Sequence, residues 1–206
     1  MRVLKNVLSQ LHTFILIALL STVFWAWIFT FVTDTAPEKK IVIFFDVPAV
    51  AEKQLDIELE KDMPDGIKMI RAHTFDYAMF DDGSLQQGDI FIIRRSNMEQ
   101  YAPDLAPLDP IFWNYDGNSY YYRSSEGVIL GLMIYDGSSA SLVNINSALL
   151  GADFVNFTFP DSEPEDYFLC FGAGSLHYPQ NDGAVDSAAL PVALNLLWEV
   201  KSDLVG

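Results

Sequence analysis

The sequence predicts one α/β domain, built on a mixed and mainly parallel sheet with flanking helices, that follows a single N-terminal transmembrane helix. Three observations carry this prediction. An apolar run without formal charge extends from Leu11 to Val32. Strand-like and helix-like segments then alternate between residues 41 and 101, an order that is typical of parallel sheets. Further apolar, β-rich segments and one C-terminal helical segment follow.

The N-terminal apolar run is expected to anchor the chain in a membrane through residues 11–33. At about 1.5 Å per residue it is long enough to cross a bilayer core of about 30 Å. A cleaved signal peptide has a shorter apolar stretch and small residues at its cleavage site, whereas residues 29–32 are mostly bulky. Arg2 and Lys5 favour a cytoplasmic N-terminus, although two lysines on the other flank weaken this preference. We therefore expect a single-pass cell-membrane protein with an extracellular C-terminal domain.

Four parts are expected along the chain. They are a cytoplasmic N-terminus (1–10), a transmembrane anchor (11–33), a short polar linker (34–40) and an extracytoplasmic α/β domain (41–206). The last part has the usual size of one domain and can bury a hydrophobic core. Cys170 is the sole cysteine of the chain and cannot form an internal disulfide.

Three strands are predicted in the first half of the domain, because short apolar segments rich in β-branched and aromatic residues end at polar or glycine-containing breaks. They are Ile41–Phe45, Ile67–Thr74 and Asp89–Ile93. Between the first two, residues 49–62 carry apolar side chains at four-residue spacing, which predicts an amphipathic helix. Ser96 and Glu99 match the S-x-x-E pattern of a capping box and predict a helix that begins there and runs toward Tyr101.

The second half of the domain is predicted to be richer in strands. Residues 119–123 and 128–135 form a predicted hairpin across the turn sequence Ser-Ser-Glu-Gly. Two further apolar segments, Phe154–Phe159 and Tyr167–Phe171, are predicted strands. Residues 184–204 are predicted to form a helix, and the proline in this segment must kink the helix or lie near its start.

The order of these elements, with several of their residues, resembles the N-terminal lobe of bacterial extracellular solute-binding proteins of the sugar-binding type. The most recognisable stretches are Gly88-Asp-Ile-Phe-Ile-Ile and Leu105-Ala-Pro-Leu-Asp109, and segments 127–136 and 167–172 are similar to later strands of that lobe. The resemblance covers residues 41–172 and implies a periplasmic-binding-protein-like lobe. The second lobe of that family needs on the order of a hundred further residues. We therefore expect a single lobe that cannot close on a solute as two-lobed proteins do.

Open parallel sheets bind ligands beyond the carboxyl ends of their strands, and polar residues follow several predicted strands here. Two adjacent arginines beside a predicted helix N-terminus could hold a carboxylate or a phosphate. The alternative is that these arginines form internal salt bridges to Asp46 or Asp89. The candidate ligand-binding residues at the predicted strand ends are Asp46, Tyr77, Arg94, Arg95, Ser96 and Asp136.

No catalytic, metal-binding or cofactor-binding constellation is predicted. His73 and His177 lack the spacing of a zinc site, and Ser175 near His177 lacks the G-x-S-x-G setting of a nucleophile. The acidic segments 76–83 and 161–166 do not match the register of a calcium loop. The net charge of −16 argues against nucleic acid as a partner, because its binding needs a basic surface.

The expected function is that of a membrane-anchored, non-catalytic extracytoplasmic module that contacts a partner membrane protein, such as a transporter. The lipid bilayer is the expected partner of residues 11–33. The alternative is a protein that binds a small solute, a sugar or an anion, in its own right at the strand ends. The chain also resembles short, acidic, single-pass bacterial membrane proteins, and that likeness implies no activity.

Overall fold

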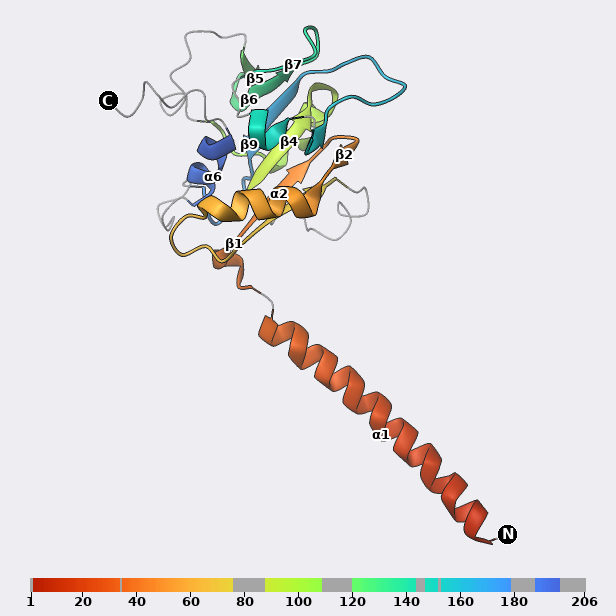
Figure 1. Cartoon of the computed structure of the whole chain (residues 1–206). Coiled ribbons are helices and arrows are strands. Elements are labelled where there is room, and N and C mark those ends of the chain that lie inside the picture. Colours follow the sequence, from red (N-terminus) through yellow and green to blue (C-terminus); the bar gives the residue numbers. More distant parts are fainter. Residues whose placement is uncertain are drawn as a thin grey trace. The chain divides into compact units, whose positions relative to one another are not determined.

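The structure is a computed structural model that divides into two compact units, Met1–Ala36 and Pro37–Gly206 (Figure 1). The first unit is a helix and the second is an α/β domain. Tyr77 and both ends of the predicted helix 184–204 lie outside the residues that the structure describes. The described residues are 2–33, 35–75, 88–108, 120–143, 147–151, 153–178 and 188–196.

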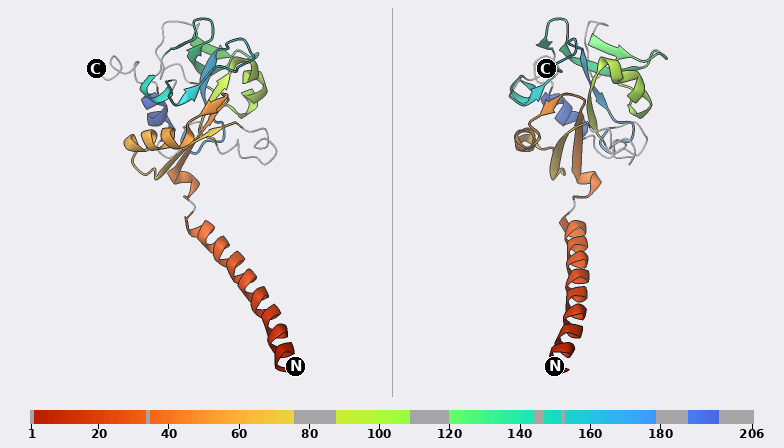
Figure 2. Two further views of the ribbon diagram at one scale, coloured as in Figure 1. Left: turned by 45° about the vertical axis from the view of Figure 1, so that its right-hand side comes forward. Right: turned by 90° about the vertical axis from the view of Figure 1, so that its right-hand side faces the viewer.

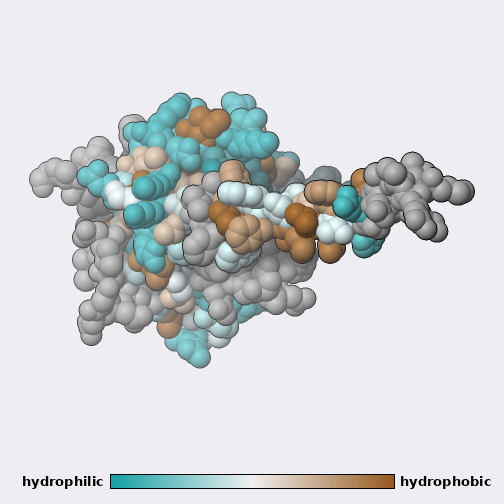
Figure 3. Space-filling model, turned by 90° about the horizontal axis from the view of Figure 1, so that it is seen from below, coloured by the Kyte–Doolittle hydropathy of each residue, from teal (hydrophilic) through white to brown (hydrophobic). Residues whose placement is uncertain are grey.

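Helix α1, Arg2–Thr33, forms the first unit. Its segment Gln10–Phe29 has 20 residues, is apolar and long enough to cross a membrane, and is not buried against other described residues. A signal sequence near an N-terminus meets the same criteria of length and composition. Figure 3 shows hydrophobic side chains along the described part of this helix. The Thr22 hydroxyl donates to the Ala18 carbonyl at 2.9 Å, so this polar group is satisfied inside the helix.

The domain is built on a seven-stranded sheet. Its strands are β1 (Lys40–Phe45), β3 (Met69–Thr74), β4 (Ile90–Arg94), β5 (Tyr121–Arg123), β6 (Ile129–Asp136), β7 (Ser141–Leu142) and β9 (Tyr167–Phe171). Their order is β3-β1-β4-β9-β6-β5, and β7 also pairs with β6. β1 pairs in parallel with β3 and β4, whereas the remaining pairs are antiparallel. The α/β fold class with a mixed sheet is therefore confirmed, and so is the predicted β5–β6 hairpin.

A separate two-stranded sheet pairs β2 (Ala49–Val50) with β8 (Val155–Asn156) in antiparallel register. This pairing corrects two predictions. The helix expected from residue 49 begins only at Glu52, as α2 (Glu52–Leu59) followed by the 3-10 turn η2 (Glu60–Asp62). The strand expected over 154–159 is confined to β8. Both errors have the same cause. The pairing joins segments that lie far apart in the sequence, and the pattern within either segment alone does not reveal it.

The helix expected from Ser96 toward Tyr101 is present, but it begins as a 3-10 turn and becomes an α-helix only at Met98. The predicted capping box is wrong, because no side-chain hydrogen bond caps this helix. The Ser96 amide donates instead to Glu165 Oε2 at 3.0 Å, and Glu99 Oε1 accepts from the Ser125 amide at 3.0 Å. The elements of this segment are η4 (Arg95–Asn97), α4 (Met98–Tyr101) and η5 (Ala102–Asp104).

Helices cover both faces of the sheet. One face packs against α2, α5 (Ser147–Leu150) and α6 (Ala189–Leu196), and the other packs against α4 (Figure 2). Helix α6 lies inside the predicted segment 184–204, and Pro191 falls in its first turn, where a missing amide hydrogen is tolerated. The architecture is therefore a three-layered one in which the central strands are inaccessible to water.

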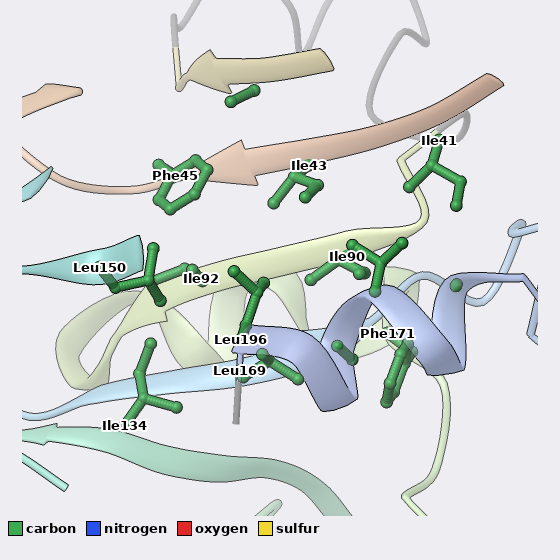
Figure 4. Close-up of a cluster of buried hydrophobic side chains, with 14 of the residues drawn as sticks. Ile41, Ile43, Phe45, Ile90, Ile92, Ile134, Leu150, Leu169, Phe171 and Leu196 are labelled. Atoms are coloured by element: carbon green, nitrogen blue, oxygen red, sulfur yellow. The ribbon is translucent and has the colours of Figure 1, made fainter. Parts of the chain in front are cut away.

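The side chains of β1 alternate between the two faces. Ile41, Ile43 and Phe45 belong to the cluster under α2 and α6, whereas Val42 and Phe44 belong to the cluster under α4. Figure 4 shows the first cluster, in which these three side chains extend from β1 toward those of β4, β9 and α6. Each fully buried side chain of this size contributes roughly 1.5–3 kcal/mol relative to an exposed one. The continuous apolar run predicted a strand covered on both faces, and this prediction is confirmed.

The outer edge of β3 is capped by carboxylates of α2. The Ala72 amide donates to Asp56 Oδ1 at 2.7 Å, and the Thr74 amide donates to Glu52 Oε1 at 2.8 Å. Glu52 and Asp56 are four residues apart and therefore lie on one face of α2. The amides of Ala72 and Thr74 are two residues apart and therefore point to one side of β3, so the two spacings match. Arg71 lies beside them, with Nη1 3.0 Å from Asp56 Oδ2. The last strand of the sheet therefore has hydrogen-bond partners on its open side.

Replacing Asp56 by alanine is expected to lower the free energy of unfolding by about 2–3 kcal/mol, because a buried amide then lacks an acceptor. That amide belongs to Ala72, which is 1% exposed. Urea denaturation measures the difference. The matched control is Glu58→Ala on the same helix. Among the described residues Glu58 forms an ion pair with the exposed Lys61 at the surface, so this variant should cost no more than about 0.5 kcal/mol. Equal losses in the two variants would contradict the capping role.

Candidate functional site

Asp46 lies directly after β1, at the edge of the sheet where β1 and β4 end. The residue is buried, at 7% exposure. Its Oδ2 accepts a hydrogen bond from the Asn97 side-chain amide at 2.8 Å and a longer one from the Arg94 backbone amide at 3.4 Å. Its own amide donates to the Ile92 carbonyl at 2.8 Å. One carboxylate therefore joins the ends of two neighbouring parallel strands.

The Arg94 side chain lies between this carboxylate and an aromatic ring. Its Nε is 3.4 Å from Asp46 Oδ2, and its guanidinium carbon is 4.9 Å from the centre of the Phe159 ring. This is the geometry of a cation–π contact. Nε is buried and has no hydrogen-bond partner of good geometry among the described residues. The two groups are therefore held by charge attraction rather than by a directed side-chain hydrogen bond.

Arg95 and Ser96 contact the segment that precedes β9. Arg95 Nη1 is 2.7 Å from Asp166 Oδ2, and the Arg95 amide donates to the Asp166 carbonyl at 2.8 Å. The Ser96 amide donates to Glu165 Oε2 at 3.0 Å. Asp166 Oδ1 also accepts from the Gly137 amide at 3.0 Å, which brings the turn after β6 to the same segment. Residues 165–166 therefore connect two of the predicted strand ends.

Asp136, at the end of β6, uses its carboxylate within its own turn. Oδ1 accepts hydrogen bonds from the Ser138 amide at 2.8 Å and the Ser138 hydroxyl at 2.7 Å, and Oδ2 accepts from the Ser139 hydroxyl at 2.9 Å. These bonds lower the pKa of Asp136 below its usual value, Ser138 having the larger effect. The side chain therefore stabilises the β6–β7 turn.

Burial governs the ionisation of Asp46. Loss of solvation raises its pKa above the ordinary value of 3.8, and the hydrogen bond from Asn97 and the charge of Arg94 oppose this rise. Tyr167, the first residue of β9, has its pKa raised first by burial and then by the negative charge of Asp46. The edge thus holds a carboxylate whose charged form is disfavoured.

The candidate residues divide into two groups. Five of them lie along one edge of the sheet, namely Asp46, Arg94, Arg95, Ser96 and Asp136. The sixth, Tyr77, lies outside the residues that the structure describes. The internal salt bridge that was the alternative for Arg94 is confirmed with Asp46. Arg95 pairs with Asp166 instead, and Asp89 lies at the opposite end of β4.

Sequence reasoning missed four residues of this edge. They are Asn97, Phe159, Glu165 and Asp166. A signal for the last two was present, because they directly precede a predicted strand. In an antiparallel strand the amino end, not the carboxyl end, lies beside the carboxyl ends of its neighbours.

The described residues hold no group of three or more histidine, cysteine, aspartate and glutamate side chains that could bind a metal ion. Cys170 is fully buried, and burial raises the pKa of its thiol. A protonated, inaccessible thiol is unreactive.

No protein-family model and no curated protein matches this chain. A solved structure that is similar to it is that of the spermidine/putrescine ABC transporter substrate-binding protein PotD from Streptococcus pneumoniae, with 16% sequence identity and a TM-score of 0.30. The match covers 47% of this chain and 32% of that protein, so this chain spans about a third of that protein's length. At this TM-score the match is a partial likeness in fold and nothing more.

Replacing Asp46 by asparagine is expected to change how stability depends on pH. Because the folded-state pKa of Asp46 is raised above 3.8, its carboxyl favours folding most below that pH, and this contribution is lost as the pH rises through the folded-state value. The stability of Asp46→Asn relative to the original protein should therefore increase as the pH rises from 3.8 through the folded-state pKa of Asp46. Urea denaturation at stepped pH measures it.

The control for this prediction is Asp136→Asn, for which the sign is reversed. The folded-state pKa of Asp136 is lowered, so its contribution to stability is present above 3.8 and is lost as the pH falls. The relative stability of Asp136→Asn should fall as the pH rises. The same slope for both variants would contradict the assigned environments.

Proposed function

We propose that this protein is a membrane-anchored, non-catalytic extracytoplasmic module, with a fold like one lobe of a solute-binding protein, that contacts a partner membrane protein such as a transporter. One observation carries the proposal. An exposed apolar helix is joined to a domain whose strand-end arginines already have carboxylate partners of their own.

The apolar helix supports the anchoring part of this proposal. Most of the large side chains of Gln10–Phe29 are exposed, and a contiguous apolar surface of this extent is unfavourable in water. A bilayer removes that surface from water without any other protein segment. Arg2 and Lys5 before the window favour a cytoplasmic N-terminus, which leaves the domain on the extracellular side.

The paired charges support partner contact over solute binding. A bound anion would have to displace Asp46 from Arg94 or Asp166 from Arg95. Removing one partner of a buried ion pair typically costs about 3–5 kcal/mol, and Asp46 is buried. A solute bound at Arg94 has to offset that cost before it shows net affinity, whereas the more exposed pair of Arg95 is weaker.

The test is photo-crosslinking of the full chain in intact membranes. A photoreactive residue is placed at Ile57 on α2 or at Leu176, which are 61% and 53% exposed large apolar residues of the domain. The exposed polar position Glu163 serves as the matched control. We expect a discrete product with one membrane protein from at least one apolar position and none from the control. Products that contain only this chain would contradict the proposal.

The alternative function, direct binding of a sugar or an anion, is favoured by one specific observation. Arg95 keeps 62% of its side chain exposed although it is paired, and it lies on the same edge as Asp46 and Arg94. Thermal-shift screening of the full chain in detergent, against sugars, carboxylates and inorganic phosphate, tests this function. At a hundredfold excess over its dissociation constant, a ligand stabilises the folded state by about 2.7 kcal/mol. The shift should disappear in Arg95→Gln, and a flat screen would remove this alternative.

A further inference from the structure

A second polar cluster lies at the opposite end of the sheet, where β1 and β4 begin. Asp89, which is 3% exposed, is its centre. Asp89 Oδ2 accepts a hydrogen bond from the Val42 amide at 2.9 Å, and the Asp89 amide donates to the Val42 carbonyl at 2.9 Å. Asp89 Oδ1 accepts from the Ser175 hydroxyl at 2.6 Å. The start of β1 is therefore tied to the segment that follows β9.

The cluster continues from Ser175 to the first turn of the domain through His177. Ser175 Oγ accepts a hydrogen bond from the His177 amide at 3.1 Å. The His177 ring nitrogen Nε2 lies 3.1 Å from the Lys40 carbonyl and 3.3 Å from the Pro37 carbonyl. Both carbonyls can only accept, so Nε2 carries the hydrogen and donates it. Pro37 is the first residue of the 3-10 turn η1 (Pro37–Lys39) and Lys40 directly follows this turn, so the ring bridges the two ends of the turn.

The packing at this end holds the His177 segment close to the sheet. His177 is only 5% exposed although its segment belongs to no helix or strand. Just before it, a Cβ on Gly172 would lie 2.1 Å from the Gly88 carbonyl oxygen, so the two backbones approach more closely than any other residue permits. The Gly172 amide donates to the Asp89 carbonyl at 3.1 Å. The segment that carries this ring is therefore held by backbone contacts of Gly172 as well as by Ser175.

We propose that Asp89, Ser175 and His177 form a clasp that fixes residues 37–40 onto the end of the sheet where β1 begins. Pro37 is the first residue of the compact domain, directly after the helix unit ends at Ala36. The clasp makes the entry point of the chain a rigid part of the domain. When the preceding chain is displaced, the clasp therefore transmits the displacement to β1, and the first turn does not take it up by moving on its own. β1 pairs in parallel with a strand on each side. This inference does not depend on the proposed function.

The clasp is tested by the mobility of a nitroxide spin label at Glu38→Cys, an exposed position of η1, in the full chain in detergent. Cys170 does not interfere, because it is buried and its thiol is protonated. The decisive pair of variants is His177→Gln and His177→Asn. The glutamine amide reaches the position of Nε2 and can donate to the Lys40 carbonyl, whereas the asparagine amide is too short. A label at Gln54→Cys on α2 reports any general loosening of the domain.

We expect the label at residue 38 to stay immobilised in the original protein and in His177→Gln, and to lose its immobilised spectral component in His177→Asn. The label at residue 54 should be unchanged in all three. An immobilised label at residue 38 in folded His177→Asn would overturn the clasp. Equal mobility in the two variants, or equal changes at residues 38 and 54, would overturn it as well. Circular dichroism establishes that each variant is folded.

Discussion

Two arginines introduced into α1, at Leu20 and Val23, are expected to release the protein from the membrane. Both positions lie within the apolar segment Gln10–Phe29 and are exposed. Replacing an aliphatic residue by arginine at the centre of a membrane helix costs about 3–4 kcal/mol, so the pair costs about 6–8 kcal/mol. Carbonate extraction followed by sedimentation should find the original chain in the membrane pellet and the double variant in the supernatant.

The control for this experiment is the double substitution of the same residues by alanine, which keeps the helix apolar and should leave the protein in the pellet. Mass spectrometry of the pelleted chain is the second readout. An anchored chain keeps residues 11–33, whereas a signal sequence is removed. A mature chain that starts after this segment would contradict anchoring by α1, whatever the arginine variant does.

Replacing Phe45 by alanine is expected to lower the free energy of unfolding by about 3–5 kcal/mol, because the substitution leaves a cavity in a close-packed core. Phe45 is 0% exposed and lies in the cluster under α2 and α6. It directly precedes Asp46, so the loss of packing also loosens the strand end that carries this carboxylate. Urea denaturation measures the loss of stability.

Two comparisons make the Phe45 prediction specific. Phe45→Leu removes less volume and should cost less than the alanine variant. Ile57→Ala removes a large apolar side chain that is 61% exposed and should change stability by no more than about 0.5 kcal/mol. A similar cost for Phe45→Ala and Ile57→Ala would show that the core under α2 and α6 is not packed as described.

Elements with a strong local pattern could be predicted from the sequence. The runs that became β1 and β9 are apolar on both faces, and the hairpin of β5 and β6 has a turn sequence between its strands. Elements that depend on distant partners could not. Residues 49–50 form a strand only because residues 155–156 lie beside them. The capping pattern at Ser96 failed because a distant residue, Glu165, accepts the hydrogen bond of its amide.

The candidate site was predictable to the extent that it follows the parallel part of the sheet. Open parallel sheets bind ligands beyond the carboxyl ends of their strands, and this rule identified Asp46 and Arg94. These two residues come from neighbouring parallel strands and contact each other. The rule does not apply to β9, whose antiparallel direction brings its amino end to this edge. Asp166, the partner of Arg95, was missed for that reason. Knowledge of the strand direction would have been needed to include it.

The carboxylates of Glu52 and Asp56 determine how a neighbouring chain can approach β3. An edge strand with unpaired backbone N–H and C=O groups can pair with a strand of another chain, and this is a common route to sheet extension and aggregation. Here the amides of Ala72 and Thr74 are already engaged. A second chain would have to expel two carboxylates before it could add a strand there. Strand addition at this side of the domain is therefore disfavoured, and the sheet is protected against extension from β3.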